Sequence, residues 1–295
     1  MKKHSFLSCF AAVVIALSCI LPCAAAEEVP SETQYVAVDG PSANTDLAFG
    51  SVCILNGCRT VDSYVPLAGS DRRLDSALAA FAFERNTGTL VYAYNPDTKI
   101  PVGGLTKMVT TLLALEYCDL NEVLTVANNS RFPSGQIHVN LKNEEQLTVE
   151  DLVYCVMLAN ASDAAVVLAE RVAGNAAGMV TLMNNRVRQM GCTSTNFSNV
   201  YGGDSGEAYT TARDMARIVM ECIKNEEFRT LFSATTYTVP ATNRSGERSL
   251  ESTNYFIWSK NITKFYDDRV TGGMQSASNG TGASLVWTAN SHNMD

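Results

Sequence analysis

Few residues in this sequence could serve as the base of a Ser-His-Asp triad. His138 and His292 are the histidines outside the N-terminal segment, and neither lies in a motif that would support a Ser-His-Asp triad. We therefore interpret both as surface residues. The Gly-Gly pair at 202–203 and the Gly-Thr-Gly segment at 280–282 lack the strand-to-helix context and the downstream lysine of phosphate-binding loops. We interpret them as turns, and the sequence gives no indication of nucleotide binding.

The cysteines show no spacing typical of metal ligands, so no metal site and no cofactor is predicted. Cys53 and Cys58 flank an Asn-Gly pair, which favours a tight turn and makes them the clearest candidates for a disulfide in an oxidising compartment. Cys155 falls on the apolar face of a predicted helix. It is interpreted as an unreactive core thiol.

The N-terminus has the form of a secretory signal over residues 1–26. Lys2 and Lys3 precede an apolar run at 6–21, and three alanines at 24–26 offer a cleavage site. The run is short for a membrane span, which favours export over a stable membrane anchor. Residues 27–70 are rich in Ser, Thr, Gly and Pro and are interpreted as a linker or small N-terminal appendage. The protein is therefore expected to be secreted or extracytoplasmic, with its main domain at 71–295.

The charge of the mature chain excludes some partners. The signal contains two of the 22 Lys+Arg and none of the 30 Asp+Glu, which leaves a formal charge of −10. A net negative charge disfavours nucleic acid and anionic surfaces as partners. With 46% hydrophobic residues, the remaining chain can bury a substantial core in one large domain or two lobes.

The order of the elements that must position any site predicts an α+β fold. Apolar, partly alternating runs at 76–84 and 89–95 flank turn residues and predict a β-hairpin. Residues 148–151 have the form of a capping box and begin a buried helix that ends near Leu158. Further helices are predicted at 105–117, 163–173, 177–190 and 211–224, of which the last is the final clear helix. Strands at 268–273 and 282–290 would complete an antiparallel sheet whose edges come from opposite chain ends.

Five stretches of this sequence resemble one known family, the serine-type D-alanyl-D-alanine carboxypeptidases. These are the low-molecular-weight penicillin-binding proteins of peptidase family S11, which are related to serine β-lactamases. The stretches are NTGTLVY at 86–92, LTKMVT at 105–110, LTVEDL at 147–152, DAAVVLAE at 163–170 and YTTARDMA at 209–216. The resemblance covers roughly residues 75–290. It implies a β-lactamase/transpeptidase-like fold, in which an antiparallel sheet is flanked by a helical subdomain.

The resemblance implies three catalytic motifs, and the first, Ser-x-x-Lys, falls on Gly104 and Lys107. Residues three apart share a helix face, so a lysine one turn after a serine can take its hydroxyl proton and activate it for acyl transfer. Here the general-base position is kept and the nucleophile is lost. Thr106 points about 100° away around the helix, and Thr110 lies deeper in an apolar helix, so neither is expected to replace the serine.

The other two motifs also depart from the family pattern. The Ser-x-Asn position is occupied by Asn160 and Ser162 in swapped order, which preserves polar contacts and disfavours proton relay. The substrate-binding Lys-Thr-Gly position falls on Met274, Gln275 and Ser276. A second register would place it at 270–272, Val-Thr-Gly. In either register the cation expected to bind a terminal carboxylate is absent, which removes electrostatic stabilisation.

Together these departures predict an exported, catalytically inactive homologue that at most binds cell-wall peptides or an unidentified protein partner. The alternative is an active enzyme that trims the terminal D-alanine from peptidoglycan stem peptides. The resemblance also implies one more strand after Asp295, between the first strand and the strand at 282–290. We therefore expect the domain to be incomplete at its C-terminal end, and a strand borrowed from another copy is one way to fill the gap.

Overall fold

The computed structural model describes residues 77–83, 85, 90–127, 134–204, 206–257, 266–278 and 280–290. The predicted signal, the linker at 27–70, the pair Cys53 and Cys58, and His292 lie outside the described residues. The predicted N-terminal hairpin is confirmed as β1 (Ala80–Phe83) and β2 (Leu90–Tyr94), which pair in antiparallel orientation. β1 is buried along its whole length and packs against α6 (Ala212–Cys222).

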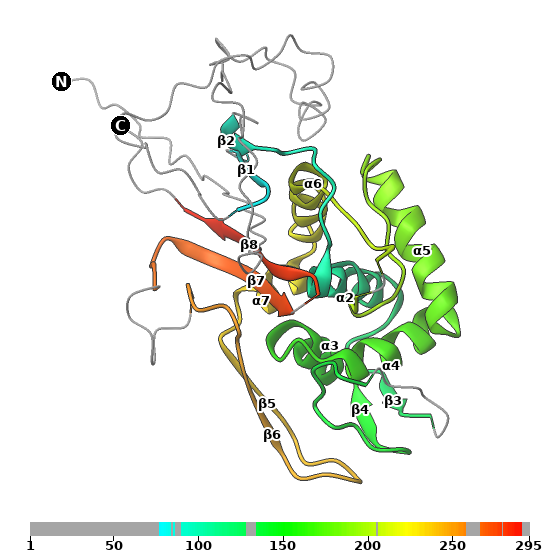
Figure 1. Cartoon of the computed structure of the whole chain (residues 1–295). Helices are drawn as coiled ribbons and strands as arrows, with labels where there is room; N and C mark the ends of the chain where they lie inside the picture. Colours follow the sequence, from blue (N-terminus) through cyan, green and yellow to red (C-terminus); the bar gives the residue numbers. More distant parts are fainter. Residues whose placement is uncertain are drawn as a thin grey trace, which may run out of the picture.

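One helix lies at the centre of the helical part. A short 3₁₀ turn, η2 (Gly103–Leu105), leads into α2 (Thr106–Tyr117), whose first nine residues are all buried. Because these nine residues are buried on all sides of the helix, α2 packs against several neighbours. These neighbours are α6 and the helices α3 (Val149–Leu158), α4 (Ser162–Ala173), α5 (Ala176–Gln189) and α7 (Glu226–Ser233). Figure 1 shows α2 within this group.

Local capping interactions explain where several helices begin and end. At the start of α3 the Thr148 side chain accepts from the Asp151 N–H, and the Asp151 carboxylate accepts from the Thr148 N–H, so the predicted capping box is confirmed. Gly174 ends α4 in the left-handed conformation at φ 77°, which glycine adopts without a steric penalty. The helices predicted at 163–173 and 177–190 agree with α4 and α5 within one residue at either end.

The prediction that the helix at 211–224 is the last one is wrong. α6 ends at Cys222, and α7 follows after a short turn in which the Asn225 side chain accepts from the Phe228 N–H. α7 has eight residues, which is too short for strong helical periodicity. Asn225 followed by Glu226 is an N-terminal capping signal that could have identified it.

The C-terminal strands form the second hairpin that matters for the site. β7 (Val270–Ser278) and β8 (Gly282–Ala289) pair in antiparallel orientation, and both contact η2. β7 extends five residues beyond the predicted strand at 268–273. Two further antiparallel pairs of short strands were not predicted: β3 (Val123–Thr125) with β4 (Gln146–Thr148), and the hairpin of β5 (Thr236–Val239) with β6 (Arg248–Glu251). In Figure 1 the β5–β6 hairpin projects away from the helices.

The arrangement is α+β, as predicted, but its strands do not form one sheet among the described residues. β1–β2 and β7–β8 are separate two-stranded sheets, and no strand pairs between them there. Within the same ranges no single helix is long and apolar enough to cross a membrane. The bent pair of α4 and α5 is long and apolar enough only when the two helices are counted together.

Candidate functional site

Gly104 lies in η2, where the chain enters α2, and its backbone N–H donates a 2.9 Å hydrogen bond to the Oγ of Ser276. These residues are 172 positions apart in the sequence. The bond is buried and joins the first and third predicted motif positions. The backbone N–H of a nucleophile position is the kind of donor that stabilises an oxyanion during acyl transfer, and here a side-chain hydroxyl already occupies it.

The second motif position meets the other two at the same point. A Cβ placed by ideal geometry on residue 104 would lie 2.4 Å from Ser276 Oγ and 3.0 Å from Asn160 Oδ1. The three motif segments, separated widely in sequence, therefore converge on the space in front of Gly104. A side chain at this position would enter a space that other side chains already fill.

Lys107 lies one turn after Gly104 and is almost completely buried, with 2% of its surface exposed. Its Nζ donates a 2.6 Å hydrogen bond to the main-chain carbonyl of Tyr201. Burial lowers the pKa of the Lys107 amine to about 7, while the negative charge of Asp163 opposes this shift. Lys107 therefore does not reach solvent. A buried amine with this pKa can exist in its neutral, basic form near pH 7.

Asn160 lies in the connection between α3 and α4, and Ser162 is the first residue of α4. Asn160 adopts a left-handed backbone conformation at φ 55°, which asparagine tolerates better than most residues. Asn160 Oδ1 and Ser162 Oγ are both buried, and neither has a hydrogen-bond partner among the described residues. The segment therefore presents polar atoms to the site, and Asn160 directs one of them at Gly104.

Met274 and Ser276 share one face of β7, because successive strand residues alternate between faces. Both are buried, whereas Gln275 is partly exposed. The second possible register, at 270–272, puts a different residue in the third position. A Cβ on Gly272 would meet Phe232 of α7, not Gly104. Of the two registers, only 274–276 brings its third residue to the nucleophile position.

Two threonines near Lys107 donate their hydroxyl protons to backbone carbonyls. Thr106 Oγ1 donates to Gly103 O at 2.8 Å, and Thr110 Oγ1 donates to Val200 O at 2.7 Å. Both side chains are buried. Their geometry agrees with the interpretation that neither replaces the missing serine, since each hydroxyl is held within the packing around α2.

The loop at 199–203 is part of this site, and the sequence interpretation missed it. Asn199 Oδ1 accepts from the N–H groups of Gly202 at 2.6 Å and Gly203 at 3.0 Å, which holds the loop in a tight turn. A Cβ on Gly202 would lie 1.9 Å from Gly103 O, so only glycine fits against η2. The Gly-Gly pair was interpreted simply as a turn. Its close approach to η2 is what requires glycine there.

Asp163, in the first turn of α4, is a second residue that sequence reasoning did not single out. It is fully buried, and its carboxylate accepts from the backbone N–H groups of Val139 at 3.2 Å, Leu141 at 3.0 Å and Ala164 at 3.0 Å. His138 Nδ1 lies 3.8 Å from Asp163 Oδ2. The His138 side chain is 22% exposed, so it lies at the surface, as interpreted, beside a buried carboxylate.

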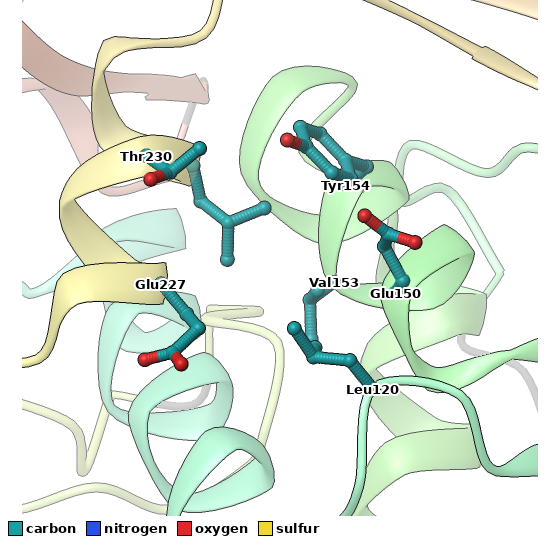
Figure 2. A pocket seen from close by; sticks show the side chains of 7 residues that line it. Leu120, Glu150, Val153, Tyr154, Glu227 and Thr230 are labelled. Atoms are coloured by element: carbon teal, nitrogen blue, oxygen red, sulfur yellow. The ribbon is translucent and has the colours of Figure 1, made fainter.

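Other features of the described residues lie apart from this site. Cys155 is buried and burial raises the pKa of its thiol to about 12, in agreement with an unreactive core thiol. No group of side chains in the described ranges has the composition to hold a metal ion. Figure 2 shows a pocket lined by residues of α3, α7 and the turn after α2: Leu120, Glu150, Val153, Tyr154, Glu227, Thr230 and Leu231. None of these residues belongs to the predicted motifs.

Comparison with known proteins agrees with the resemblance. Residues 70–295 match the model of the peptidase S11 family, described as D-alanyl-D-alanine carboxypeptidase. The chain is 31% identical over 222 residues to D-alanyl-D-alanine carboxypeptidase DacA of Haemophilus influenzae, covering 70% of this chain and 52% of that relative. DacF of Bacillus subtilis is 29% identical over 194 residues, covering 64% of this chain and 48% of the relative. The chain thus spans about half the length of these curated relatives.

The fold is shared with solved structures. A D-alanyl-D-alanine carboxypeptidase from Mycobacterium tuberculosis matches with a TM-score of 0.64 at 22% identity, over 79% of this chain and 89% of that one. The S216A mutant of the Streptomyces K15 DD-transpeptidase matches with a TM-score of 0.61 at 22% identity, over 73% and 90% of the two chains. At this identity the likeness shows a common fold.

Proposed function

The chain belongs to the peptidase S11 family of D-alanyl-D-alanine carboxypeptidases, and we propose that it is an exported homologue that no longer catalyses acyl transfer and binds cell-wall peptides. One observation carries the proposal. Residue 104 has no side chain, and its backbone N–H is taken by the Ser276 hydroxyl. Loss of the nucleophile alone lowers the rate of a serine hydrolase by many orders of magnitude.

The polar groups around Gly104 support a role in binding. Asn160 Oδ1 and Ser162 Oγ are buried without partners among the described residues, and Lys107 contributes an amine at the same site. Groups of this kind could bond to the amides of a peptide. The ligand class that fits the family is a peptidoglycan stem peptide ending in D-Ala-D-Ala, bound at the exported protein's cell-wall location. Met274 cannot supply a positive charge to the terminal carboxylate.

The alternative function, an active carboxypeptidase, is favoured by one observation. Lys107 keeps the position of a general base, and burial brings its pKa to about 7, a value suited to proton transfer near neutral pH. The amine could activate a water molecule in place of the missing serine. Such a water would lack most of the positioning advantage that a covalently tethered hydroxyl provides.

Fluorescent penicillin separates the two functions. A covalent penicillin adduct needs a nucleophile, so we expect no labelled band after denaturing electrophoresis, with a catalytic relative such as Bacillus subtilis DacF labelled in parallel. A band that survives denaturation would contradict the inactive assignment. D-alanine release from a synthetic peptide ending in D-Ala-D-Ala tests water activation by Lys107, and should stay at the level of a Lys107→Met variant.

Peptide binding is measured separately by calorimetry, with peptides ending in D-Ala-D-Ala and in L-Ala-L-Ala. The proposal expects heat of binding that is specific for the D-Ala-D-Ala peptide. Equal binding of the two peptides, or binding of neither, would contradict the peptide-binding role and leave the loss of catalysis as a separate conclusion.

A further inference from the structure

We propose that Ser276 closes the acyl-transfer position, so that residues 104 and 276 form a matched pair in which only one can carry a hydroxyl-bearing side chain. The Ser276 hydroxyl fills the space of the side chain that Gly104 lacks. This inference goes beyond the proposed function, because it concerns the packing of the site itself, whether or not a peptide binds nearby.

The backbone at residue 104 does not itself require glycine. Gly103 has a positive φ of 57°, but Gly104 is not among the described residues with positive φ. A side chain at 104 is therefore compatible with the chain conformation and is opposed by the surrounding atoms. The nearest of these atoms is Ser276 Oγ, 2.4 Å from an ideal Cβ, and Ser276 Cβ follows at 3.0 Å. Such contacts are closer than van der Waals packing allows.

The Ser276 hydroxyl cannot rotate away from residue 104 without breaking a buried hydrogen bond. It accepts the 2.9 Å hydrogen bond from Gly104 N in a buried environment. If it rotated to make room, that N–H would be left without its acceptor, and a buried unpaired donor is costly. Rotation would also leave Ser276 Cβ and Asn160 Oδ1 at 3.0 Å from the new side chain. A serine at 104 therefore strains the site in either hydroxyl position.

The pairing has a direct consequence for ligands. A carbonyl oxygen bound for acyl transfer would need the Gly104 N–H, and Ser276 holds that donor. Restoring serine at 104 alone would leave the donor occupied and the space overfilled. Two changes are needed to reopen the position: a side chain at 104 and the removal of the side chain at 276.

A thermal-unfolding cycle tests this pairing without relying on activity. It compares the full chain with the Gly104→Ser, Ser276→Gly and combined variants. Overpacking of a buried site predicts that Gly104→Ser lowers the unfolding midpoint by roughly 3–10 °C. In the Ser276→Gly background the same change should lower the midpoint by less than half as much, since residues in contact are not additive.

Ser284 provides a matched control. It is buried and lies opposite Ser276 in the β7–β8 register, and its atoms are not among the nearest to a Cβ at 104. Ser284→Gly introduces the same strand glycine without removing the clash, so the effect of Gly104→Ser should stay unchanged in that background. Equal shifts in all backgrounds, or no shift in the native one, would overturn the proposal. If Gly104→Ser fails to fold, a folded combined variant supports the pairing and an unfolded one contradicts it.

Discussion

The Nζ of Lys107 donates a 2.6 Å hydrogen bond to the main-chain carbonyl of Tyr201, which lies 94 positions further along the chain. The bond ties the start of α2 to the loop at 199–203. Thr110 makes a similar contact one turn later, through its hydroxyl to Val200 O. Lys107 therefore has a structural role as an anchor for the loop at 199–203, which is independent of any role as a base.

The lowered pKa of Lys107 predicts a specific pH dependence of stability. In the unfolded chain the amine has its ordinary pKa of 10.5, and in the folded chain burial lowers the pKa to about 7. Between these values the unfolded state binds more protons, so stability rises with pH in this window. We measure the free energy of unfolding in urea from roughly pH 7.5 to 9 for the native protein and for Lys107→Met. The difference between the two should increase by up to about 1.4 kcal/mol per pH unit.

The control for this experiment is Lys224→Met. Lys224 is 65% exposed in its ion pair with Glu221, so its removal should leave the slope of the native protein unchanged. Taking the difference in stability between the native protein and each variant also removes the contribution of the buried thiols, because the native protein and both variants contain them. A Lys107→Met variant with the same slope as the native protein would show that the amine titrates normally.

Two glycines with the same backbone angle provide a test of the loop at 199–203. Gly202 and Gly174 both have φ 77°, so the positive φ disfavours alanine at either site. A Cβ at Gly174 meets nothing within 4 Å, whereas one at Gly202 would lie 1.9 Å from Gly103 O. Gly174→Ala should cost about 1 kcal/mol, and Gly202→Ala at least about 2 kcal/mol more. Equal losses on chemical unfolding would show that the loop does not press on η2.

Asp163 should be required for the fold around the site. Its buried carboxylate accepts hydrogen bonds from three backbone N–H groups. The side-chain amide of asparagine would replace one acceptor oxygen with an NH₂ group, which is a donor and cannot accept from these N–H groups. We expect Asp163→Asn to lower the free energy of unfolding by about 1–3 kcal/mol. Asp119, an exposed carboxylate that accepts from Asn121 N, supplies the control, since Asp119→Asn should change stability by less than about 0.5 kcal/mol. Similar effects of the two substitutions would contradict a structural role for Asp163.

The parts of the fold that were predicted from sequence are those with strong local signals. α3 was predicted to its end residue because the Thr148 capping box marks its start and apolar periodicity marks its buried face. α7 and the β5–β6 hairpin were missed, since each segment is too short for its periodicity to be distinguished from irregular structure.

The candidate site was predictable as far as its motif positions. The sequence placed Gly104, Asn160 and Ser276 in three separate motifs, and the structure brings them around one point. The contributions of Tyr201 and Gly202 were not predictable, because a carbonyl acceptor and a glycine that packs closely leave no distinctive side chain to recognise. That Ser276 replaces a missing side chain was equally hidden, since it depends on a distance between residues far apart in the chain.

A cation at residue 274 should be strongly destabilising. Met274 is 1% exposed and lies opposite Val286 in the β7–β8 register, within the apolar core. A lysine there would place an ammonium among apolar side chains, where an unpaired charge is strongly destabilising. Met274→Lys should therefore lower the free energy of unfolding by at least about 3 kcal/mol at neutral pH. The loss of stability caused by Met274→Lys should become smaller at higher pH, because the buried amine becomes neutral.

The neighbouring Gln275 provides the comparison for this substitution. It is partly exposed and lies on the opposite face of β7, so Gln275→Lys can keep its charge near solvent. We expect that variant to change stability by less than about 0.5 kcal/mol. If Met274→Lys were tolerated as well as Gln275→Lys, the 274 side chain would have access to solvent or to an anionic partner. A lysine at residue 274 could then bind a carboxylate.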